Sequence, residues 1–397
     1  MKVYFAPCGI GLGHAGRCLP IAKRLAKENV EIVFSTYREG IDYVERENFP
    51  LLKAPPIGFQ VKSDGSVDFR QTAINPGPFI ASFTLLNQVG FELKAIGSIR
   101  PDVVVSDSRA SPLIAARLLG VPRICILNQF QMRDTRKKRF LRLSRLAESI
   151  GLAFIGLTWT MGNSVLIPDF PPPYTICKGN LVIPRAYRKS VKLIGPILPE
   201  HPNSLPTKEK LRQKLNLPMD KPVVFVPISG PTTEKAFVTG ILRKILLDFP
   251  SDYEIVVSYG YPSADTKPIQ HGNVTIYKWL ARARRFEYLK ACDVAIGRAG
   301  HGTITQCICY GKPMVIIPTP GHTEQLTNAL QAKNLGVAKI VLQEVLDREN
   351  LLRSVQQLLQ PQTIQRAEQV QEEALKHDGL KNAAEAIVAT ANNEQIF

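Results

Sequence analysis

The most constraining feature of the chain is residues 293–329, where a buried strand, a glycine-rich turn, a helix and a second buried strand follow one another. Residues 294–296 and 314–317 are short apolar runs, which is typical of strands buried on both faces of a parallel sheet. The glycine-rich turn at 297–302 lies between the first run and a helix that we expect over 303–310. This succession predicts an α/β domain built on a parallel sheet.

The glycine-rich turn favours binding of a phosphate or diphosphate, because small residues let the backbone approach a ligand and a helix N-terminus offers free N–H groups. Glu324 and Gln325 follow the second strand, at the sheet edge where ligands of open α/β sheets bind. A diphosphate site beside side chains that bind hydroxyl groups predicts a nucleotide-sugar donor. The alternative is an ordinary turn beside a solvated loop or helix cap. The candidate donor residues of the turn are Arg298, Gly300, His301, Gly302 and Thr303.

The same stretch resembles the donor-binding signature of GT-B glycosyltransferases, in the family 28 type group with the UDP-glycosyltransferases and the lipid II-forming N-acetylglucosaminyltransferase. Gln306 departs from that signature, because the family has a glutamate there that binds the ribose hydroxyls. An amide can accept one hydrogen bond and donate another, but it carries no charge. The matching positions are Arg298, Gly300, Thr303, Gly311, Pro313, Pro318, Glu324, Gln325, Asn328 and Ala329.

The resemblance covers nearly the whole chain and implies two doubly wound, Rossmann-like domains that face a cleft. We expect an N-terminal acceptor-binding domain at 1–194 and a proline-rich linker at 195–220. The C-terminal nucleotide-sugar-binding domain is then expected at 221–375. A terminal helix at 376–397, which overlaps a helical stretch expected over 363–391, would cross back onto the N-terminal domain, as in the family.

The N-terminal half alternates strand-like and helix-like segments, which predicts its doubly wound sheet. A glycine turn with Gly11 and Gly13 follows the first strand. Its spacing differs from the Gly-x-Gly-x-x-Gly of dinucleotide-binding proteins, so a nicotinamide cofactor is not expected. The expected strands are 3–7, 30–35, 103–106 and 123–127, and the expected helices are 17–28 and 112–119.

His14 and Asp107 are the candidate catalytic pair, since each follows a strand at the same sheet edge. A histidine titrates near the working pH, as a general base should, and an aspartate on the other ring nitrogen would select its tautomer. His14 and Asp107 resemble the His–Asp pair of the UDP-glycosyltransferases. The alternatives are that His14 structures its turn or binds an acceptor phosphate, and that Asp107 caps the following helix.

The C-terminal half supplies further donor candidates after expected strands at 222–227, 253–258 and 274–277. Ser229, Gly230 and Thr232 follow the first of these strands, and their N–H and hydroxyl groups could stabilise a diphosphate. Trp279 either stacks on the nucleobase or packs in the core. Arg298 either contacts the donor, lies on the surface or joins an interdomain ion pair. The chain has no Asp-x-Asp motif for a divalent ion, so no metal or other cofactor is expected.

The formal net charge is +16, and part of it is concentrated between residues 133 and 145. Apolar residues interleave with the basic ones there, which is typical of a segment that binds an anionic membrane surface and suits a lipid-linked acceptor. A solvated basic helix is the alternative, and nucleic acid is not expected because no nucleic-acid-binding fold accompanies the charge. The patch residues are Arg136, Lys137, Arg139 and Arg142.

We expect a cytoplasmic protein, peripheral on the membrane face. The seven cysteines are scattered singly, as reduced thiols are, and neither a signal peptide nor a run of about 20 apolar residues is present. The predicted function is an inverting, metal-independent glycosyltransferase that uses a nucleotide sugar, expected to be UDP-linked, and a lipid-linked or other amphiphilic acceptor. The alternatives are a UDP-N-acetylglucosamine 2-epimerase-like enzyme and a non-catalytic partner subunit that keeps the nucleotide site, which Gln306 favours.

Overall fold

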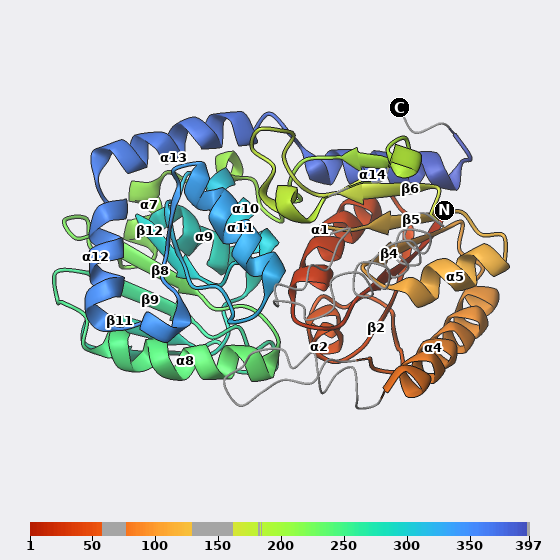
Figure 1. Cartoon of the computed structure of the whole chain (residues 1–397), viewed down its shortest axis with the longest axis horizontal. Helices are drawn as coiled ribbons and strands as arrows, with labels where there is room; N and C mark the ends of the chain where they lie inside the picture. The colour runs from red at the N-terminus through yellow and green to blue at the C-terminus, as the bar shows by residue number, and fades with distance from the viewer. Residues whose placement is uncertain (58–76, 129–161, 182, 184, 395–397) are drawn as a thin grey trace, which may run out of the picture.

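The computed structural model describes residues 1–57, 77–128, 162–181, 183 and 185–394. Two α/β domains lie side by side in it (Figure 1). The basic segment 133–145 lies outside the described residues.

The N-terminal domain is a seven-stranded sheet with the order β3-β2-β1-β4-β5-β6-β7, and all of its neighbouring strands are parallel. The apolar runs in the sequence form its central strands, which are buried along almost their whole length. The strands are β1 Lys2–Pro7, β2 Glu31–Thr36, β3 Leu51–Lys53, β4 Val103–Asp107, β5 Arg123–Ile126, β6 Ser164–Ile167 and β7 Val191–Leu193. The helices are α1 Gly13–Lys27, α2 Glu39–Glu45, α4 Gly77–Ile99 and α5 Ala110–Leu118, with short 3-10 turns η1 Ile176–Asn180 and η2 Arg185–Tyr187.

The C-terminal domain repeats this plan with the order β10-β11-β9-β8-β12-β13-β14, in which β10 pairs antiparallel to β11. Its strands are β8 Val223–Pro227, β9 Glu254–Ser258, β10 Pro268–His271, β11 Val274–Tyr277, β12 Val294–Gly297, β13 Met314–Ile316 and β14 Ala338–Ile340. Its helices are α7 Lys208–Lys214, α8 Thr232–Leu247, α9 Arg282–Ala291, α10 His301–Cys309, α11 Thr323–Asn334, α12 Arg348–Leu358 and α13 Pro361–Ala374, with η3 Pro202–Ser204 and η4 Gln343–Val345.

The strand order of each sheet reverses at its first strand, which creates a crevice at the carboxyl ends of two neighbouring strands. In the N-terminal sheet the reversal lies between β1 and β4, where Pro7 is in register with Asp107. In the C-terminal sheet it lies between β8 and β12. Both glycine-rich turns of the sequence follow a strand at these two points.

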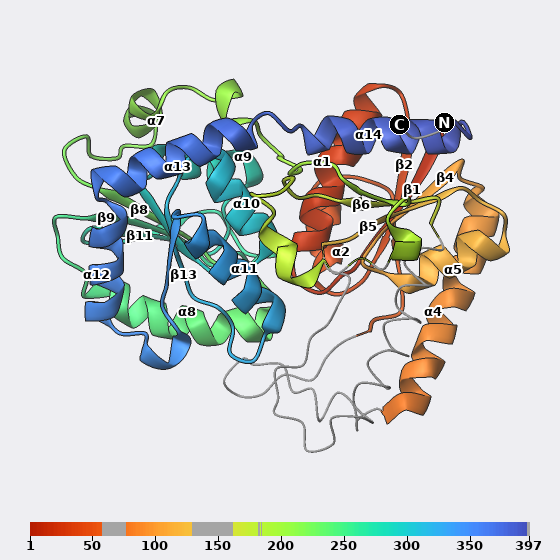
Figure 2. The ribbon, with the colours of Figure 1, turned by 45° about the horizontal axis from the view of Figure 1, so that its top comes forward.

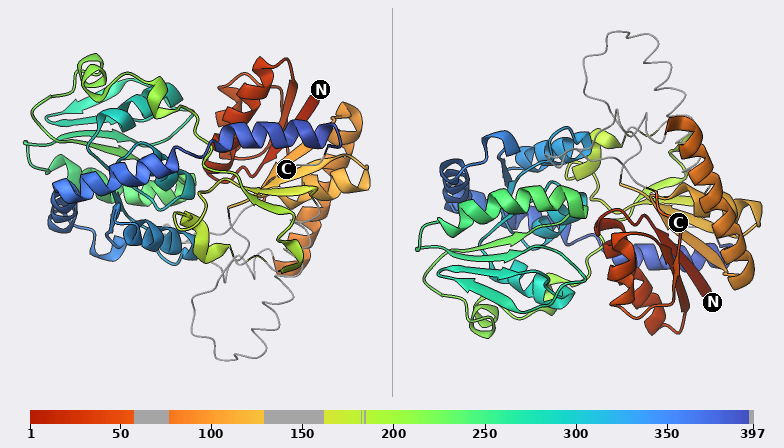
Figure 3. Two further views of the ribbon diagram at one scale, coloured as in Figure 1. Left: turned by 90° about the horizontal axis from the view of Figure 1, so that it is seen from above. Right: turned by 90° about the horizontal axis from the view of Figure 1, so that it is seen from below.

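The C-terminal helix α14 (Gly379–Ala391) packs on the N-terminal domain (Figure 2), where Ala383 and Ile387 belong to the same core as β1 and α1. The stretch expected to be helical over 363–391 consists of two helices, α13 and α14, which run across the top of both domains (Figure 3). Only glycine fits at the start of α14, because a Cβ on Gly379 would lie 2.0 Å from the Gly195 carbonyl oxygen.

The segment expected as a linker at 195–220 differs from that expectation in its second half. Residues 208–214 form α7, and Leu211 and Leu215 are buried in the core of the C-terminal domain. Apolar side chains at helical spacing place this part in the domain rather than in solvent. Among the residues that the structure describes, no helix combines the length and apolarity needed to cross a bilayer.

Candidate active site

The glycine turn after β1 in the N-terminal domain directly contacts the turn after β8 in the C-terminal domain. Gly11 has a φ of +67°, which favours glycine, and a Cβ there would lie 3.4 Å from the carbonyl carbon of Gly230. Glu39 bridges the two turns, because its carboxylate accepts hydrogen bonds from the N–H of Thr232 at 3.1 Å and from the N–H of Gly11 at 3.4 Å. The predicted acceptor-side turn and the turn that carries Ser229, Gly230 and Thr232 therefore lie side by side.

His14 and Asp107 lie together, as the strand order predicts. His14 Nδ1 is 2.7 Å from Asp107 Oδ1, and the Asp107 side chain is fully buried while the imidazole is 24% exposed. Helix α1 begins at Gly13, four residues earlier than expected, so His14 belongs to the first turn of a helix rather than to a loop. The helix gives the imidazole a defined position next to the end of β4.

Arg17 is a third member of this cluster that the sequence analysis did not identify. Its Nε donates to Asp107 Oδ2 at 2.6 Å and its Nη2 donates to Oδ1 at 2.7 Å. Burial alone would raise the pKa of Asp107, but Arg17 and His14 lower it to about 2. The signal was present in the sequence, because residues three apart on a helix share a face and His14 and Arg17 have that spacing.

A hydrogen-bond chain continues from Arg17 to the other domain. Asn128, which follows β5, accepts from Arg17 Nη2 at 3.5 Å and donates from Nδ2 to Glu324 Oε1 at 2.7 Å. Glu324 lies in the first turn of α11. The amide of Asn128 therefore links the predicted donor residue Glu324, across the domain boundary, to Arg17, which lies beside the predicted base His14.

The N-termini of α8 and α10 come together at the second crevice. Ser229 Oγ and Thr303 Oγ1 are 3.3 Å apart, and Thr232 is the first residue of α8. Gly300 is the N-cap of α10, which begins at His301, two residues before the expected start. Two helix N-termini with adjacent hydroxyl groups can stabilise a diphosphate.

Known proteins resemble this chain in amino-acid sequence. Residues 225–387 match the family model of the glycosyltransferase family 28 C-terminal domain. An uncharacterized glycosyltransferase of Methanosarcina mazei is 27% identical over 403 residues, which cover 99% of this chain and 100% of that protein. The UDP-N-acetylglucosamine–N-acetylmuramyl-(pentapeptide) pyrophosphoryl-undecaprenol N-acetylglucosamine transferase of Caldanaerobacter subterraneus is 25% identical over 374 residues, covering 90% of this chain and 91% of that protein.

Two solved structures have the same fold over almost their full length. The glycotransferase of kitacinnamycin superposes with a TM-score of 0.64 at 18% identity, covering 98% of each chain. MurG of Acinetobacter baumannii superposes with a TM-score of 0.57 at 18% identity, covering 98% of this chain and 99% of that one. The chain is a glycosyltransferase with the GT-B fold, and residues 225–387 match the C-terminal domain of family 28. The predicted fold and the predicted enzyme class are thereby confirmed.

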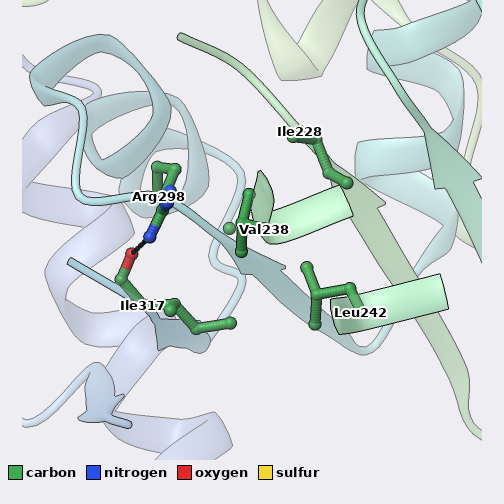
Figure 4. A pocket seen from close by; sticks show the side chains of 6 residues that line it. Ile228, Val238, Leu242, Arg298 and Ile317 are labelled. Atoms are coloured by element: carbon green, nitrogen blue, oxygen red, sulfur yellow. Dashed lines mark hydrogen bonds between the residues drawn. The ribbon is translucent and has the colours of Figure 1, made fainter. Parts of the chain in front are cut away.

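Arg298 of this glycosyltransferase has a different place from each of those considered in the sequence. Its guanidinium is buried and donates to the carbonyl oxygens of Ile317 at 3.2 Å and Pro318 at 3.4 Å, and to Gln343 Oε1 at 2.7 Å. Figure 4 shows it directed at Ile317, beside apolar side chains of α8. Burial lowers the pKa of Arg298 to about 10. Arg298 thus stabilises the chain after β13, because the backbone carbonyl oxygens there need a hydrogen-bond donor. In this structure its guanidinium is engaged there and not at a site for the nucleotide sugar.

The Gln325 side chain also forms its hydrogen bonds within the protein. Its side-chain oxygen accepts from the Thr319 N–H at 3.0 Å, and its Nε2 donates to Glu234 Oε1 at 3.1 Å. Only 8% of Gln325 is exposed. Of the predicted Glu–Gln pair, Glu324 is therefore the member that faces the site, while Gln325 orders the turn that carries it.

Trp279 packs in the core, which is the second of the two alternatives predicted for it. It lies edge-on to Tyr43 with ring centroids 5.8 Å apart, and the Arg46 guanidinium lies 5.8 Å from the centre of its ring. Trp279 belongs to a core cluster that otherwise consists largely of N-terminal-domain residues. The indole therefore stabilises the contact between the domains and is not available to stack on a base in this structure.

Gln306, where the sequence departs from the family signature, contacts Arg285. The Arg285 Nη2 donates to Gln306 Oε1, and the guanidinium lies 5.1 Å from the centre of the Phe286 ring. Burial lowers the pKa of Arg285. A neutral amide thus accepts from a partly buried cation at this position.

His301 lies in an interdomain contact rather than toward the cleft. Its Nε2 is 3.1 Å from Asp169 Oδ2, and both side chains are buried. Cys177 completes a group of possible metal ligands within 4.8 Å of one another. Asp169 already accepts from the N–H groups of Phe170, Ile176 and Cys177. Its oxygens therefore have partners without a metal ion.

Two further predicted glycines lie in the first turns of helices. Gly13 begins α1, and Gly302 lies in the first turn of α10. A Cβ on either glycine would meet nothing within 4 Å. The membrane or acceptor patch of Arg136, Lys137, Arg139 and Arg142 lies outside the described residues.

Proposed function

We propose that this glycosyltransferase transfers a sugar from a nucleotide sugar, UDP-linked, to a lipid-linked or other amphiphilic acceptor, with inversion and without a metal ion. The observation that carries the proposal is the His14–Asp107 pair at one crevice, opposite the α8 and α10 N-termini at the other. The first arrangement suits a general base, and the second suits a diphosphate leaving group.

The proposed step is a single displacement. His14 Nε2 accepts the proton of an acceptor hydroxyl while that oxygen attacks the anomeric carbon. The bond from this carbon to the diphosphate oxygen breaks on the opposite face, so the configuration inverts and the nucleoside diphosphate leaves. N–H groups at the starts of α8 and α10, with Ser229 and Thr303 hydroxyls, would stabilise its charge. If the acceptor is an ionised phosphate, His14 binds it and no proton moves.

Two further observations support the acceptor class and the place of action. A relative that is 25% identical is named as an N-acetylglucosamine transferase of a pyrophosphoryl-undecaprenol compound. The basic segment at 133–145 carries interleaved apolar residues, as surface-bound membrane segments do. We therefore infer action at the cytoplasmic membrane face.

The test is a transfer assay with UDP, GDP, dTDP and ADP sugars and a short polyprenyl diphosphate sugar as acceptor, with nucleotide affinity measured by calorimetry. His14→Ala is expected to lower turnover about 100-fold or more while donor affinity stays within twofold. His271→Ala is the matched control, since His271 is exposed on β10. Turnover in His14→Ala equal to the control would refute the role of His14.

The alternative of a non-catalytic partner subunit rests on Gln306 and is separated by the same experiment. A binder would show a calorimetric signal with one nucleotide family and no turnover in the unsubstituted protein. Transfer that persists in excess EDTA supports the metal-independent mechanism. Transfer that EDTA abolishes, and that Mg²⁺ restores, contradicts it.

A further inference from the structure

Arg17 is a charged group of the active site that the proposed step does not use. Its side chain is 11% exposed, and it forms a bidentate pair with the fully buried Asp107. Bidentate guanidinium–carboxylate pairs define the plane of the carboxylate as well as stabilising its charge. Arg17 therefore determines which way the Asp107 oxygens face, including the oxygen that contacts His14.

The geometry also selects the tautomer of His14. Asp107 is ionised at neutral pH, since its pKa is about 2, so the 2.7 Å contact requires a hydrogen on Nδ1 of His14. The lone pair of a neutral ring then lies on Nε2, for which the described residues supply no hydrogen-bond partner. This is the tautomer that a general base needs.

The charge balance around His14 differs from that of a simple His–Asp pair. Arg17 Nη2 lies 3.1 Å from His14 Nδ1, so a fixed cation adjoins the ring that must become an imidazolium. Both Arg17 and a protonated His14 are attracted to the Asp107 carboxylate. The two cations also repel each other, which offsets part of that attraction. With Arg17 present, the cluster is neutral overall before His14 takes a proton.

The two thiols near the cluster leave this balance unchanged. Cys18 Sγ lies 3.8 Å from Asp107 Oδ2, and Cys125 is buried in the adjacent strand. Burial raises the pKa of both thiols, so they stay neutral. Glu324 of α11 lies across the amide of Asn128 from Arg17. Burial alone would lower the pKa of Arg17, but the charge of Asp107 foremost, and that of Glu324 as well, raises it.

We propose that Arg17 is a positioning residue of the transfer reaction, which acts through Asp107 to orient His14 and to limit how strongly the ring holds its proton. This inference rests on the proposed function for its catalytic consequence. Its consequence for the titration of His14 holds in the free protein, whether or not a donor is turned over.

The test uses Arg17→Gln and Arg17→Lys, with Lys27→Gln as the control because Lys27 is exposed on the same helix. The titration midpoint of the His14 ring is measured by NMR in each protein. In Arg17→Gln we expect it to move to higher pH by about one pH unit, because a neighbouring cation is removed. Arg17→Lys keeps the charge and should stay nearer the unsubstituted protein. A midpoint in Arg17→Gln equal to that in Lys27→Gln would overturn the inference.

Kinetics provide the second readout. In Arg17→Gln, kcat should fall about 10- to 100-fold with the donor KM within twofold, and the acidic limb of the pH profile should move in the same direction as the NMR midpoint. Added guanidinium should restore part of kcat in Arg17→Ala and none in His14→Ala. Unchanged kcat in folded Arg17→Gln would contradict a positioning role. Absence of transfer in the unsubstituted protein would instead refute the proposed function, and the NMR midpoints would still decide the inference.

Discussion

The Glu39 carboxylate accepts a hydrogen bond from the Thr232 N–H at 3.1 Å, so the N-terminal domain places an anion at the first turn of α8. Burial alone would raise the pKa of Glu39, but backbone N–H groups, that of Thr232 foremost, lower it. The carboxylate is therefore ionised at the helix end where we propose that a diphosphate binds. The two anions would compete for the same N–H groups.

This relationship predicts that Glu39→Gln binds the donor more tightly. Removing a negative charge from the N-terminus of α8 should strengthen nucleotide-sugar binding about two- to fivefold, because charges at helix ends have effects of this size. Calorimetry with the nucleoside diphosphate measures it. Glu45→Gln is the control, since Glu45 is exposed on the same helix and pairs with Lys53. Unchanged or weaker binding in Glu39→Gln would contradict competition.

Asp107→Asn should destabilise the protein by about 3 kcal/mol at neutral pH, because it leaves Arg17 partly buried without its carboxylate. The pKa of Asp107 is about 2 in the folded protein, below its ordinary value of 3.8. A lowered pKa stabilises the folded state above the ordinary value, and this stabilisation is lost as the pH falls through the folded value. Urea unfolding of both proteins should thus give a difference that shrinks from about pH 4 toward pH 2. A difference that does not change over this range would show that the pair is not responsible.

Gln306→Glu should stabilise the protein by about 1 kcal/mol, because a carboxylate accepts from the Arg285 guanidinium more strongly than an amide does. The gain should fall in high salt, which screens the new ion pair. Chemical unfolding at low and high salt measures both effects, and the same substitution in Arg285→Ala is the control. Equal gains with and without Arg285 would rule out the ion pair as the cause.

The membrane proposal predicts that changing Arg136, Lys137 and Arg139 to glutamate abolishes flotation with anionic vesicles. The matched control changes Lys27, Lys210 and Lys333, which are exposed on other elements, so that the net charge falls equally. The control protein should still float. Retained binding of the first variant would reject a basic membrane patch at 133–145.

Much of the fold follows from local patterns. Apolar runs separated by glycine turns and helical periodicity predicted β1, β4, β8, β12 and β13 to within one or two residues. The pairing of His14 with Asp107 was also predictable, because parallel strands bring their carboxyl ends to one sheet edge. Helix starts were less accurate, since α1 and α10 begin earlier than the periodic apolar residues indicate.

The amino-acid sequence by itself determined the two α/β domains, the glycine turns at their crevices and the residue types that a sugar transfer needs. Only the tertiary structure decided which of those side chains face the site. Arg298, Gln325, His301 and Trp279 contact partners far away in the chain, and so does Arg17, which contacts Asp107. The physical reason is that a polar or aromatic side chain adopts the orientation that satisfies it inside the folded protein, and its partners come from strands and helices that meet only after folding.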